Sequence, residues 1–313
     1  MPFTAKSGKF NASINTLTIG TGDKAITLGG ENVLPFYTFD APIENAPKVG
    51  IEITDGGMEN EPECIQKCYE GCTTVVDMAK AAAAMEGVEF LSLRLEGGDP
   101  NGLNKSTEEL VQIVKDVAAA VDLPLVVCGC KNVEKDAELL SKAAEALDGR
   151  NALLLAAKEE NYKTVGAAAG LAYKQVVGAE SSVDINLAKQ LNVLLSQLGV
   201  NGQSIAMNIG TASAGYGFEY VISTMDRIKA AALSQNDATL QMPIITPVAS
   251  EVWGVKEAVA SEADMPEWGP AEERGIDMEI ETAAADLVSG SNAVILRHPA
   301  SVVTISKLIK ELV

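Results

Sequence analysis

The sequence predicts an α/β fold, a (β/α)8 barrel of the TIM type preceded by an N-terminal β-hairpin. The chain has 313 residues and 47% hydrophobic content, enough to bury one large core. Short apolar runs alternate with helical stretches, with a spacing of roughly 25 to 40 residues. Eight runs are expected to form strands, at residues 49–54, 90–95, 125–128, 152–156, 175–179, 205–209, 243–246 and 293–297. Most are apolar on both faces, as parallel strands covered by helices must be, and eight such strands favour a closed barrel over the alternative, an open doubly wound sheet.

The first 46 residues do not follow this alternation. Residues 10–19 alternate with a period of two, residues 20–23 form a turn, and residues 25–28 can pair back as the second arm of a hairpin. We therefore expect a hairpin extension over residues 1–46 and a barrel over residues 47–313. The extension is interpreted either as a cover over the bottom of the barrel or as an arm that binds a partner.

The stretches between the strand runs carry helix signals. After the second run, Ser106 is placed to cap a helix whose first turn contains Glu109, and Leu110, Val114 and Val117 follow at helical spacing. This pattern predicts an amphipathic helix that covers the sheet.

Charge and composition exclude several classes of partner. Lys and Arg number 24 against 43 Asp and Glu, which gives a net charge of −19 and disfavours nucleic acid and anionic membrane surfaces. No apolar run approaches the roughly 18 residues of a membrane span, and the opening residues lack an apolar leader. We expect a cytoplasmic protein whose five cysteines are reduced.

The carboxyl ends of the strand runs are the expected functional face, because the loops there vary without disturbing a barrel core. Residues 208–217 are almost all small, which indicates either a seat for a broad, flat ligand or a phosphate, or an ordinary flexible loop. The loop over residues 247–269 holds both tryptophans. We expect Trp253 to form a contact surface and Trp268 to pin the loop to the barrel's own rim.

The cysteines give only a weak metal signal. Cys64, Cys68 and Cys72 are spaced by four residues, so a helix would point their thiols in parallel, whereas zinc and iron–sulfur ligands surround a common centre. A metal cluster is the less favoured interpretation. Cys128 and Cys130 end the third strand run, and we expect them to be buried as small apolar residues.

Two residues are considered as catalysts. His298, the only histidine, ends the last strand run, where it is either an acid, base or ligand or, as we favour, a hydrogen-bonded rim residue. Lys158 suits Schiff-base chemistry if it is desolvated, but its neighbours Glu159 and Glu160 favour the charged ammonium. The sequence contains no convincing catalytic triad, Walker loop or dinucleotide-binding loop.

Four stretches together resemble the small-subunit family of corrinoid iron–sulfur proteins of the acetyl-CoA pathway, the delta-type subunits of acetyl-CoA decarbonylase/synthase. They are FNASINTL at residues 10–17, ITLGGEN at 26–32, LRLEGGDPN at 93–101 and VILRHP at 294–299. The resemblance covers essentially the whole chain. It implies a barrel related to pterin-dependent methyltransferases, paired with a large subunit that carries the iron–sulfur cluster and a mobile corrinoid domain.

The resemblance also implies a role in methyl transfer. The corrinoid, a cobamide held base-off, would lie between the large subunit and the top of this barrel. It would take a methyl group from methyltetrahydrofolate with the help of a methyltransferase and pass it to carbon monoxide dehydrogenase/acetyl-CoA synthase. The resemblance gives no metal ligand to this subunit, and the absence of an Asp-x-His-x-x-Gly motif argues against His298 as a cobalt ligand.

The resemblance names no corrinoid contacts, so the expected ones rest on strand-end geometry, and we assign no catalytic residue. The candidates that follow strands two, three and six are Asp99, Asn101, Gly129, Asn208, Thr211, Ser213 and Tyr216. Two rival functions remain. One is a free-standing pterin- or carbonyl-binding enzyme that uses Asp55, Asp99 and Asn208 with Lys158 or His298 as catalyst. The other is a purely structural partner that touches no ligand.

Overall fold

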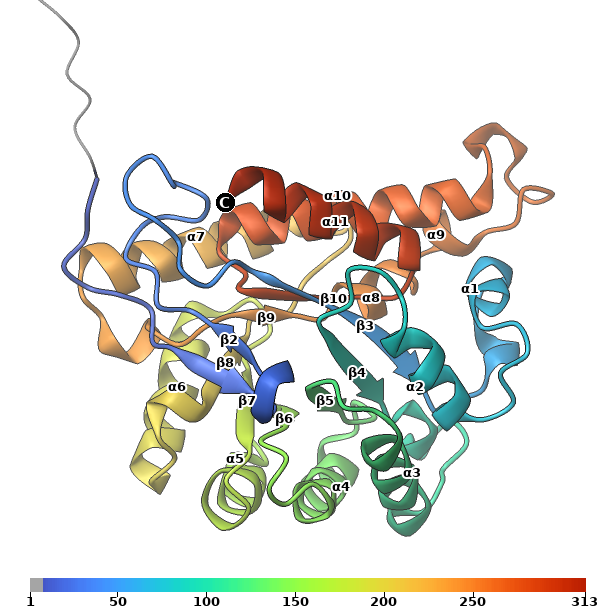
Figure 1. Ribbon diagram of the computed structural model, residues 1–313, viewed down its shortest axis with the longest axis horizontal. Coiled ribbons are helices and arrows are strands. Elements are labelled where there is room, and N and C mark those ends of the chain that lie inside the picture. The colour runs from blue at the N-terminus through green and yellow to red at the C-terminus, as the bar shows by residue number, and fades with distance from the viewer. Residues whose placement is uncertain (1–7) are drawn as a thin grey trace, which may run out of the picture.

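The computed structural model describes residues 8–313 and contains the expected eight-stranded parallel barrel (Figure 1). The opening residues 1–7, on which the absence of a leader was judged, lie outside the described residues. The barrel strands are β3 (Lys48–Thr54), β4 (Phe90–Arg94), β5 (Leu125–Cys128), β6 (Leu153–Ala157), β7 (Val176–Glu180), β8 (Ile205–Asn208), β9 (Ile245–Thr246) and β10 (Ala293–Leu296). All eight strand runs are confirmed, with shifts of one or two residues at their ends.

The strands form a nearly closed barrel, which confirms the closed form over the open sheet. The hydrogen-bonded order runs β8-β7-β6-β5-β4-β3-β10-β9, so the first and last barrel strands in the chain, β3 and β10, are paired in parallel. The remaining gap between β8 and β9 is bridged at Met207 and Ile244, and the Met207 amide donates to the Pro243 carbonyl at 2.8 Å. The carboxyl ends of all eight strands therefore meet at one mouth.

Helices surround the barrel (Figure 1). They are α1 (Glu63–Cys68), α2 (Val75–Ala83), α3 (Thr107–Ala120), α4 (Val133–Ala146), α5 (Tyr162–Val165), α6 (Ile185–Leu198), α7 (Phe218–Ser234), α8 (Val248–Val252), α9 (Lys256–Val259), α10 (Ala271–Ser289) and α11 (Pro299–Leu312). A π-helical stretch, Gly166–Ala172, continues α5. Short 3-10 turns occupy Gly22–Lys24, Met58–Asn60, Glu96–Gly98, Gly202–Ser204, Ala238–Leu240 and Pro266–Trp268.

The helix expected after Ser106 is confirmed as α3. The Ser106 hydroxyl accepts from the Glu109 amide, and the Glu109 carboxylate in turn accepts from the Ser106 amide, which is a complete capping box. Leu110, Val114 and Val117 are buried against the sheet. The helical spacing of these apolar residues is what places them on one face.

The N-terminal hairpin closes the bottom of the barrel, as one of our two interpretations expected. Strand β1 (Leu17–Ile19) pairs antiparallel with β2 (Ile26–Leu28). Their inward side chains join a second core cluster with residues from inside the barrel, including Phe90, Val126 and Leu153. Figure 1 shows the hairpin in blue against the strands. The division of the chain at residue 46 stays a prediction.

Among the described residues, no helix is long and apolar enough to cross a membrane.

Candidate functional site at the barrel mouth

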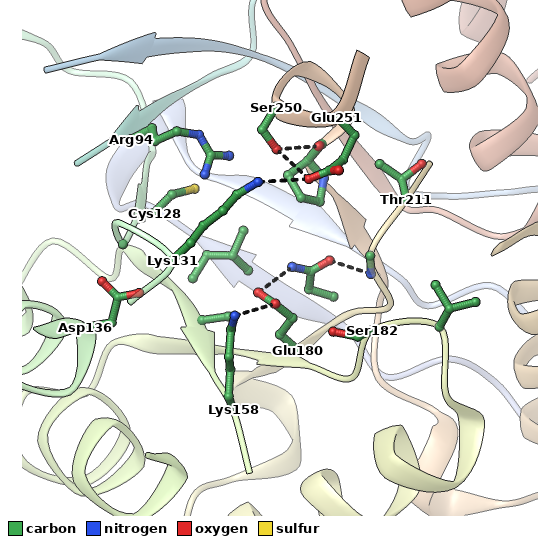
Figure 2. Close-up of a pocket in the computed structure, with 17 residues that line it drawn as sticks. Arg94, Cys128, Lys131, Asp136, Lys158, Glu180, Ser182, Thr211, Ser250 and Glu251 are labelled. Atoms are coloured by element: carbon green, nitrogen blue, oxygen red, sulfur yellow. Dashed lines mark hydrogen bonds and ion pairs between the residues drawn. The ribbon is translucent and has the colours of Figure 1, made fainter. Parts of the chain in front are cut away.

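A cavity of about 260 Å³ opens at the carboxyl ends of the barrel strands. Figure 2 shows its lining side chains converging from several strand ends and from α8. Polar and charged residues supply much of that lining: Arg94, Lys131, Asp136, Lys158, Glu180, Ser182, Asn208, Thr211, Ser250 and Glu251. The mouth is thus a polar hollow on the functional face expected for this fold.

The charges inside this cavity are paired. Lys158 forms an ion pair with Glu180 at 2.9 Å, and Lys131 reaches Glu251, on α8, at 3.1 Å. The Asn208 amide donates to the Glu180 carboxylate at 3.4 Å. Lys158 was expected to be held charged by Glu159 and Glu160, but the structure assigns this contact to Glu180 from the next strand.

A second cavity, of about 330 Å³, adjoins the first. Arg94, Gly129, Lys131 and Ser250 line both cavities and so form their junction. The remaining lining residues of the second cavity are Glu96, Asp99, Cys130, Trp253, Gly254 and Arg297.

Beneath the junction lies a buried network of ion pairs. Glu52, on β3, contacts Arg94 at 2.7 Å and Arg297 at 2.6 Å, and Arg297 also contacts Glu61 at 2.9 Å. Burial alone would raise the pKa of Glu52, but the facing guanidinium groups of Arg94 and Arg297 outweigh it and lower that pKa to about 2. The carboxylate is therefore ionised and holds both arginines in place.

The loop after β5 approaches the cavity through its backbone. The Cys130 amide donates to the Asp136 carboxylate at 2.7 Å, and burial raises the pKa of Asp136. A Cβ atom at Gly129 would lie 2.3 Å from Asp136 Oδ1, so only glycine fits there. Cys128 and Cys130 are buried as expected, and burial raises the pKa of both thiols to about 11, which keeps them protonated and unreactive.

The small-residue loop after β8 is anchored to three helices. The Thr211 hydroxyl donates to Asp286 on α10 at 2.8 Å, the Ser213 hydroxyl donates to the Glu251 carbonyl on α8 at 2.9 Å, and the Tyr216 hydroxyl donates to the Glu257 carboxylate on α9. These contacts argue against the alternative that residues 208–217 form an ordinary flexible loop. The loop presents a fixed edge to the cavity.

The structure brings some of the expected contact residues together and separates others. Gly129, Asn208 and Thr211 line the first cavity, and Asp99 lines the second. Asn101 bonds to the Asp99 carboxylate outside both cavities, Ser213 is 1% exposed, and Tyr216 is 51% exposed on the outer rim. Asn208 is also held in shape, since its Oδ1 accepts from the Gly210 amide at 2.9 Å.

The expectation that Trp253 forms a contact surface is wrong. Its side chain is buried beneath α10, stacks on His298 with ring centroids 6.1 Å apart, and donates to Glu279 at 2.9 Å. The loop that carries it folds into the short helices α8 and α9, which pack onto α10 and turn the indole inward. Trp268 meets the cations of Lys256, on α9, and Arg274, in the first turns of α10. Its role in pinning the loop to the barrel rim stays a prediction.

His298 is a satisfied rim residue, as we favoured. It caps the start of α11, where its Nδ1 accepts from the Ala300 amide at 3.1 Å, and burial lowers its pKa. Its Nε2 lies 3.8 Å from the Cys68 thiol and 3.6 Å from Glu272. Among residues 8–313, no group of three or more His, Cys, Asp and Glu side chains is placed to hold a metal ion.

The sequence reasoning missed the charged residues that end strands. Arg94 and Glu180 are the last residues of β4 and β7. Two further charged residues of the lining follow strands instead of ending them: Lys131 lies in the loop after β5, and Glu251 lies on α8, after β9. The available signal was a charged residue closing an apolar run, which in this fold points at the mouth. Their pairing could not be inferred, because the partners are far apart in the chain.

Comparison with known proteins identifies the family. A family model described as the CO dehydrogenase/acetyl-CoA synthase delta subunit matches residues 16–298. The acetyl-CoA decarbonylase/synthase complex subunit delta of Archaeoglobus fulgidus is 33% identical over 301 residues, covering 94% of this chain and 65% of that protein. The corresponding subunit of Methanothermobacter thermautotrophicus is 32% identical over 296 residues, covering 94% of this chain and 74% of that protein. The chain therefore spans about two thirds to three quarters of the length of these relatives.

Solved structures confirm the fold. Dihydropteroate synthase of Xanthomonas albilineans with 4-aminobenzoic acid has a TM-score of 0.57 at 14% identity, covering 95% of this chain and 98% of that one. The enzyme of Burkholderia cenocepacia has a TM-score of 0.55 at 13% identity, covering 96% and 97%. At this identity the likeness shows the barrel fold alone. The family model and the relatives carry the assignment, and by them the chain belongs to the CO dehydrogenase/acetyl-CoA synthase delta-subunit family.

Proposed function

We propose that this chain is the non-catalytic small subunit of a heterodimeric corrinoid iron–sulfur methyl carrier, and that its barrel mouth covers one side of a cobamide. The observation that carries the proposal is family membership over 94% of the chain, joined to a polar mouth at the face where barrels bind ligands. When bound, the corrinoid supplies a cobalt ion that accepts and releases the methyl group.

The volume of the two mouth cavities limits how a corrinoid could bind to this chain. Pockets that enclose drug-sized ligands measure about 300–1,000 Å³, so cavities of about 260 and 330 Å³ cannot enclose a large macrocycle. A corrinoid would lie across the mouth and be shared with a second protein. The fit is favourable, because Asn208 and Thr211 offer amide and hydroxyl groups to the ring's peripheral amides, and Gly129 lets the ring approach the backbone.

The chain's own residues position and shield rather than react. Lys158 is paired with Glu180, and Asp55, one of the hydrogen-bonding residues considered for an enzyme, is buried and forms an ion pair with Lys105 at 3.0 Å. No finding supports the free-standing enzyme. The hydrogen bonds that anchor residues 208–217 hold the polar groups of this loop in fixed directions, and the loop would shield a bound corrinoid from water.

The partners follow from the same proposal. The large subunit would carry the iron–sulfur cluster and the mobile corrinoid domain, and hold the cobamide base-off. A methyltetrahydrofolate corrinoid methyltransferase would supply the methyl group, and carbon monoxide dehydrogenase/acetyl-CoA synthase would receive it. All these steps would take place in the cytoplasm.

The test is reconstitution with the large subunit under anaerobic conditions. Cobamide absorbance should co-elute with the pair in gel filtration, and weakly or not at all with either chain alone. Asn208→Ala should reduce the cobamide retained by the pair, because it removes an amide from the mouth. Asn201→Ala is the matched control and should leave retention unchanged, because Asn201 caps the short turn that precedes the same strand, away from the mouth.

Other outcomes identify the rivals. Retention unaffected by variants at the mouth, in a pair that still forms, would indicate a purely structural subunit. Turnover of methyltetrahydrofolate by this chain alone would indicate a free-standing enzyme. Either result would overturn the proposal.

A further inference from the structure

We propose that the junction of the two mouth cavities is a binding subsite for an oxyanion, the carboxylate or phosphate group of a small ligand. Arg94, Gly129, Lys131 and Ser250 line both cavities. Two of them are cations and one is a hydroxyl, so the side chains shared by the cavities are chiefly hydrogen-bond donors. The inference goes beyond the proposed function, because the subsite belongs to this chain alone.

Arg94 supplies an unused donor. It is 6% exposed, and its Nε and Nη2 both bind Glu52 Oε2, at 2.9 and 2.7 Å. Its Nη1 has no hydrogen-bond or ion-pair partner in the part of the chain that the structure describes. A largely buried guanidinium fixed from behind, with one amino group left over toward a cavity, is preorganised for an oxygen ligand.

Lys131 supplies the charge. Its ammonium contacts Glu251 at 3.1 Å, but the two side chains are 61% and 40% exposed. An exposed pair of this kind contributes little to stability, so an incoming oxyanion can take the place of the Glu251 carboxylate. That carboxylate already shows that an oxyanion fits at this distance from Lys131.

Ser250 completes the set. Its hydroxyl makes only long contacts, at 3.3 Å with the Pro247 carbonyl and 3.4 Å with Glu251, so it is free to turn toward a ligand. Figure 2 shows Arg94 and Lys131 pointing into the same space, with Ser250 and Glu251 across it. None of the four shared residues is acidic, although the chain as a whole carries a net charge of −19.

The first experiment titrates inorganic phosphate, and then succinate, into the purified chain at low ionic strength, with calorimetry as the readout. We expect saturable binding that Lys131→Met weakens about tenfold, since one charge-assisted contact is lost. Glu251→Gln should tighten binding, because the competing carboxylate is removed.

An exposed ion pair on the outside of α4 provides matched controls. Lys142 and Glu145 contact each other at 3.6 Å with exposures similar to those of the mouth pair, so Lys142→Met and Glu145→Gln make the same charge changes away from the junction. Both should leave the affinity unchanged. Absence of saturable binding of either anion, or equal effects of Lys131→Met and Lys142→Met, would overturn the proposal.

Arg94→Lys tests the second donor and should weaken binding at least as much, because the lysine keeps the charge opposite Glu52 but loses the guanidinium fork. If Arg94→Lys does not fold, the affinities of Lys131→Met and Glu251→Gln for phosphate still test the proposed subsite.

A second arm separates two sources of the oxyanion. In the heterodimer, cobamide binding is compared with binding of cobinamide, which lacks the phosphate-bearing nucleotide tail. If Lys131→Met weakens only cobamide binding, the tail phosphate occupies the subsite. If neither corrinoid is affected while phosphate binding to the chain is lost, the occupant is a free small anion. A heterodimer that binds no corrinoid would contradict only the proposed function, because the phosphate titration uses this chain alone.

Discussion

Glu52 lies fully buried between Arg94 and Arg297, whose guanidinium groups keep its carboxylate ionised and are in turn neutralised by it. A buried pair contributes little net stability when intact, but removing one partner leaves an uncompensated charge in a low dielectric. The mouth therefore rests on a network whose members cannot be changed singly without cost.

Glu52→Gln should lower the free energy of unfolding by about 3–5 kcal/mol at pH 7, because two guanidinium groups lose their counter-charge. Urea unfolding measures it. The half-exposed Lys48–Glu89 pair gives the control, Glu89→Gln, which should cost less than about 1 kcal/mol. The folded pKa of Glu52, about 2, lies below its ordinary 4.5. Its contribution is thus complete above 4.5 and lost as the pH falls toward 2. A difference between wild type and Glu52→Gln that stayed constant from pH 5 to pH 3 would contradict this account.

Asp286, on α10, is a buried carboxyl group whose pKa is raised, whereas that of Glu52 is lowered. Burial raises its pKa to about 7, only Thr211 donates to it, and its Oδ1 has no partner among the described residues. A raised carboxyl pKa gives stability that is complete below the ordinary value, 3.8, and is lost as the pH rises toward 7.

Asp286→Asn should therefore stabilise the protein at pH 8, on the order of 2–4 kcal/mol, and have little effect near pH 4. The asparagine side chain can still accept from Thr211. Denaturant unfolding at the two pH values checks the prediction, and a stabilisation of equal size at both would show that the ionisation of Asp286 is not its cause.

At the scale of elements, the hairpin of β1 and β2 packs as part of the barrel core. Leu17 and Ile19 of β1 are fully buried and share a cluster with side chains from inside the barrel. Thr18, between them, faces outward. The alternation that predicted the hairpin from the sequence is the same alternation that separates its buried face from its exposed face.

Leu17→Ala should lower the free energy of unfolding by about 2–5 kcal/mol, because it leaves a cavity at the bottom of the barrel. Thr18→Ala in the same strand is the matched control and should change it by less than about 0.5 kcal/mol. Thermal and urea unfolding would report both. Equal and small effects would mean that the hairpin is not packed as part of the core.

At the scale of the whole molecule, the excess of acidic residues sets the response to salt. With a net charge of −19, the surface repels itself at pH 7, and added salt screens this repulsion. The buried pairs around Glu52 are screened much less.

Raising the sodium chloride concentration from 0.05 to 0.5 M shortens the screening length about threefold and should raise the Tm at pH 7. Near the isoelectric point, about 4.5, the same change should have little effect, because the net repulsion has vanished. Calorimetric scans at the two pH values make the comparison. A lower Tm in high salt at pH 7 would show that surface ion pairs outweigh the net repulsion.

The sequence by itself determined the barrel, the hairpin and the cap at Ser106, because strand alternation, apolar runs and capping residues act over short stretches of chain. It also placed Gly129 and Asn208 at the mouth, since the ends of parallel strands share one face. Only the tertiary structure decided that Trp253 turns inward, because an aromatic residue in a loop does not record which side of the loop will pack. Likewise, Lys131 and Glu251 are 120 residues apart, and their pairing exists only because barrel closure brings distant strand ends to one mouth.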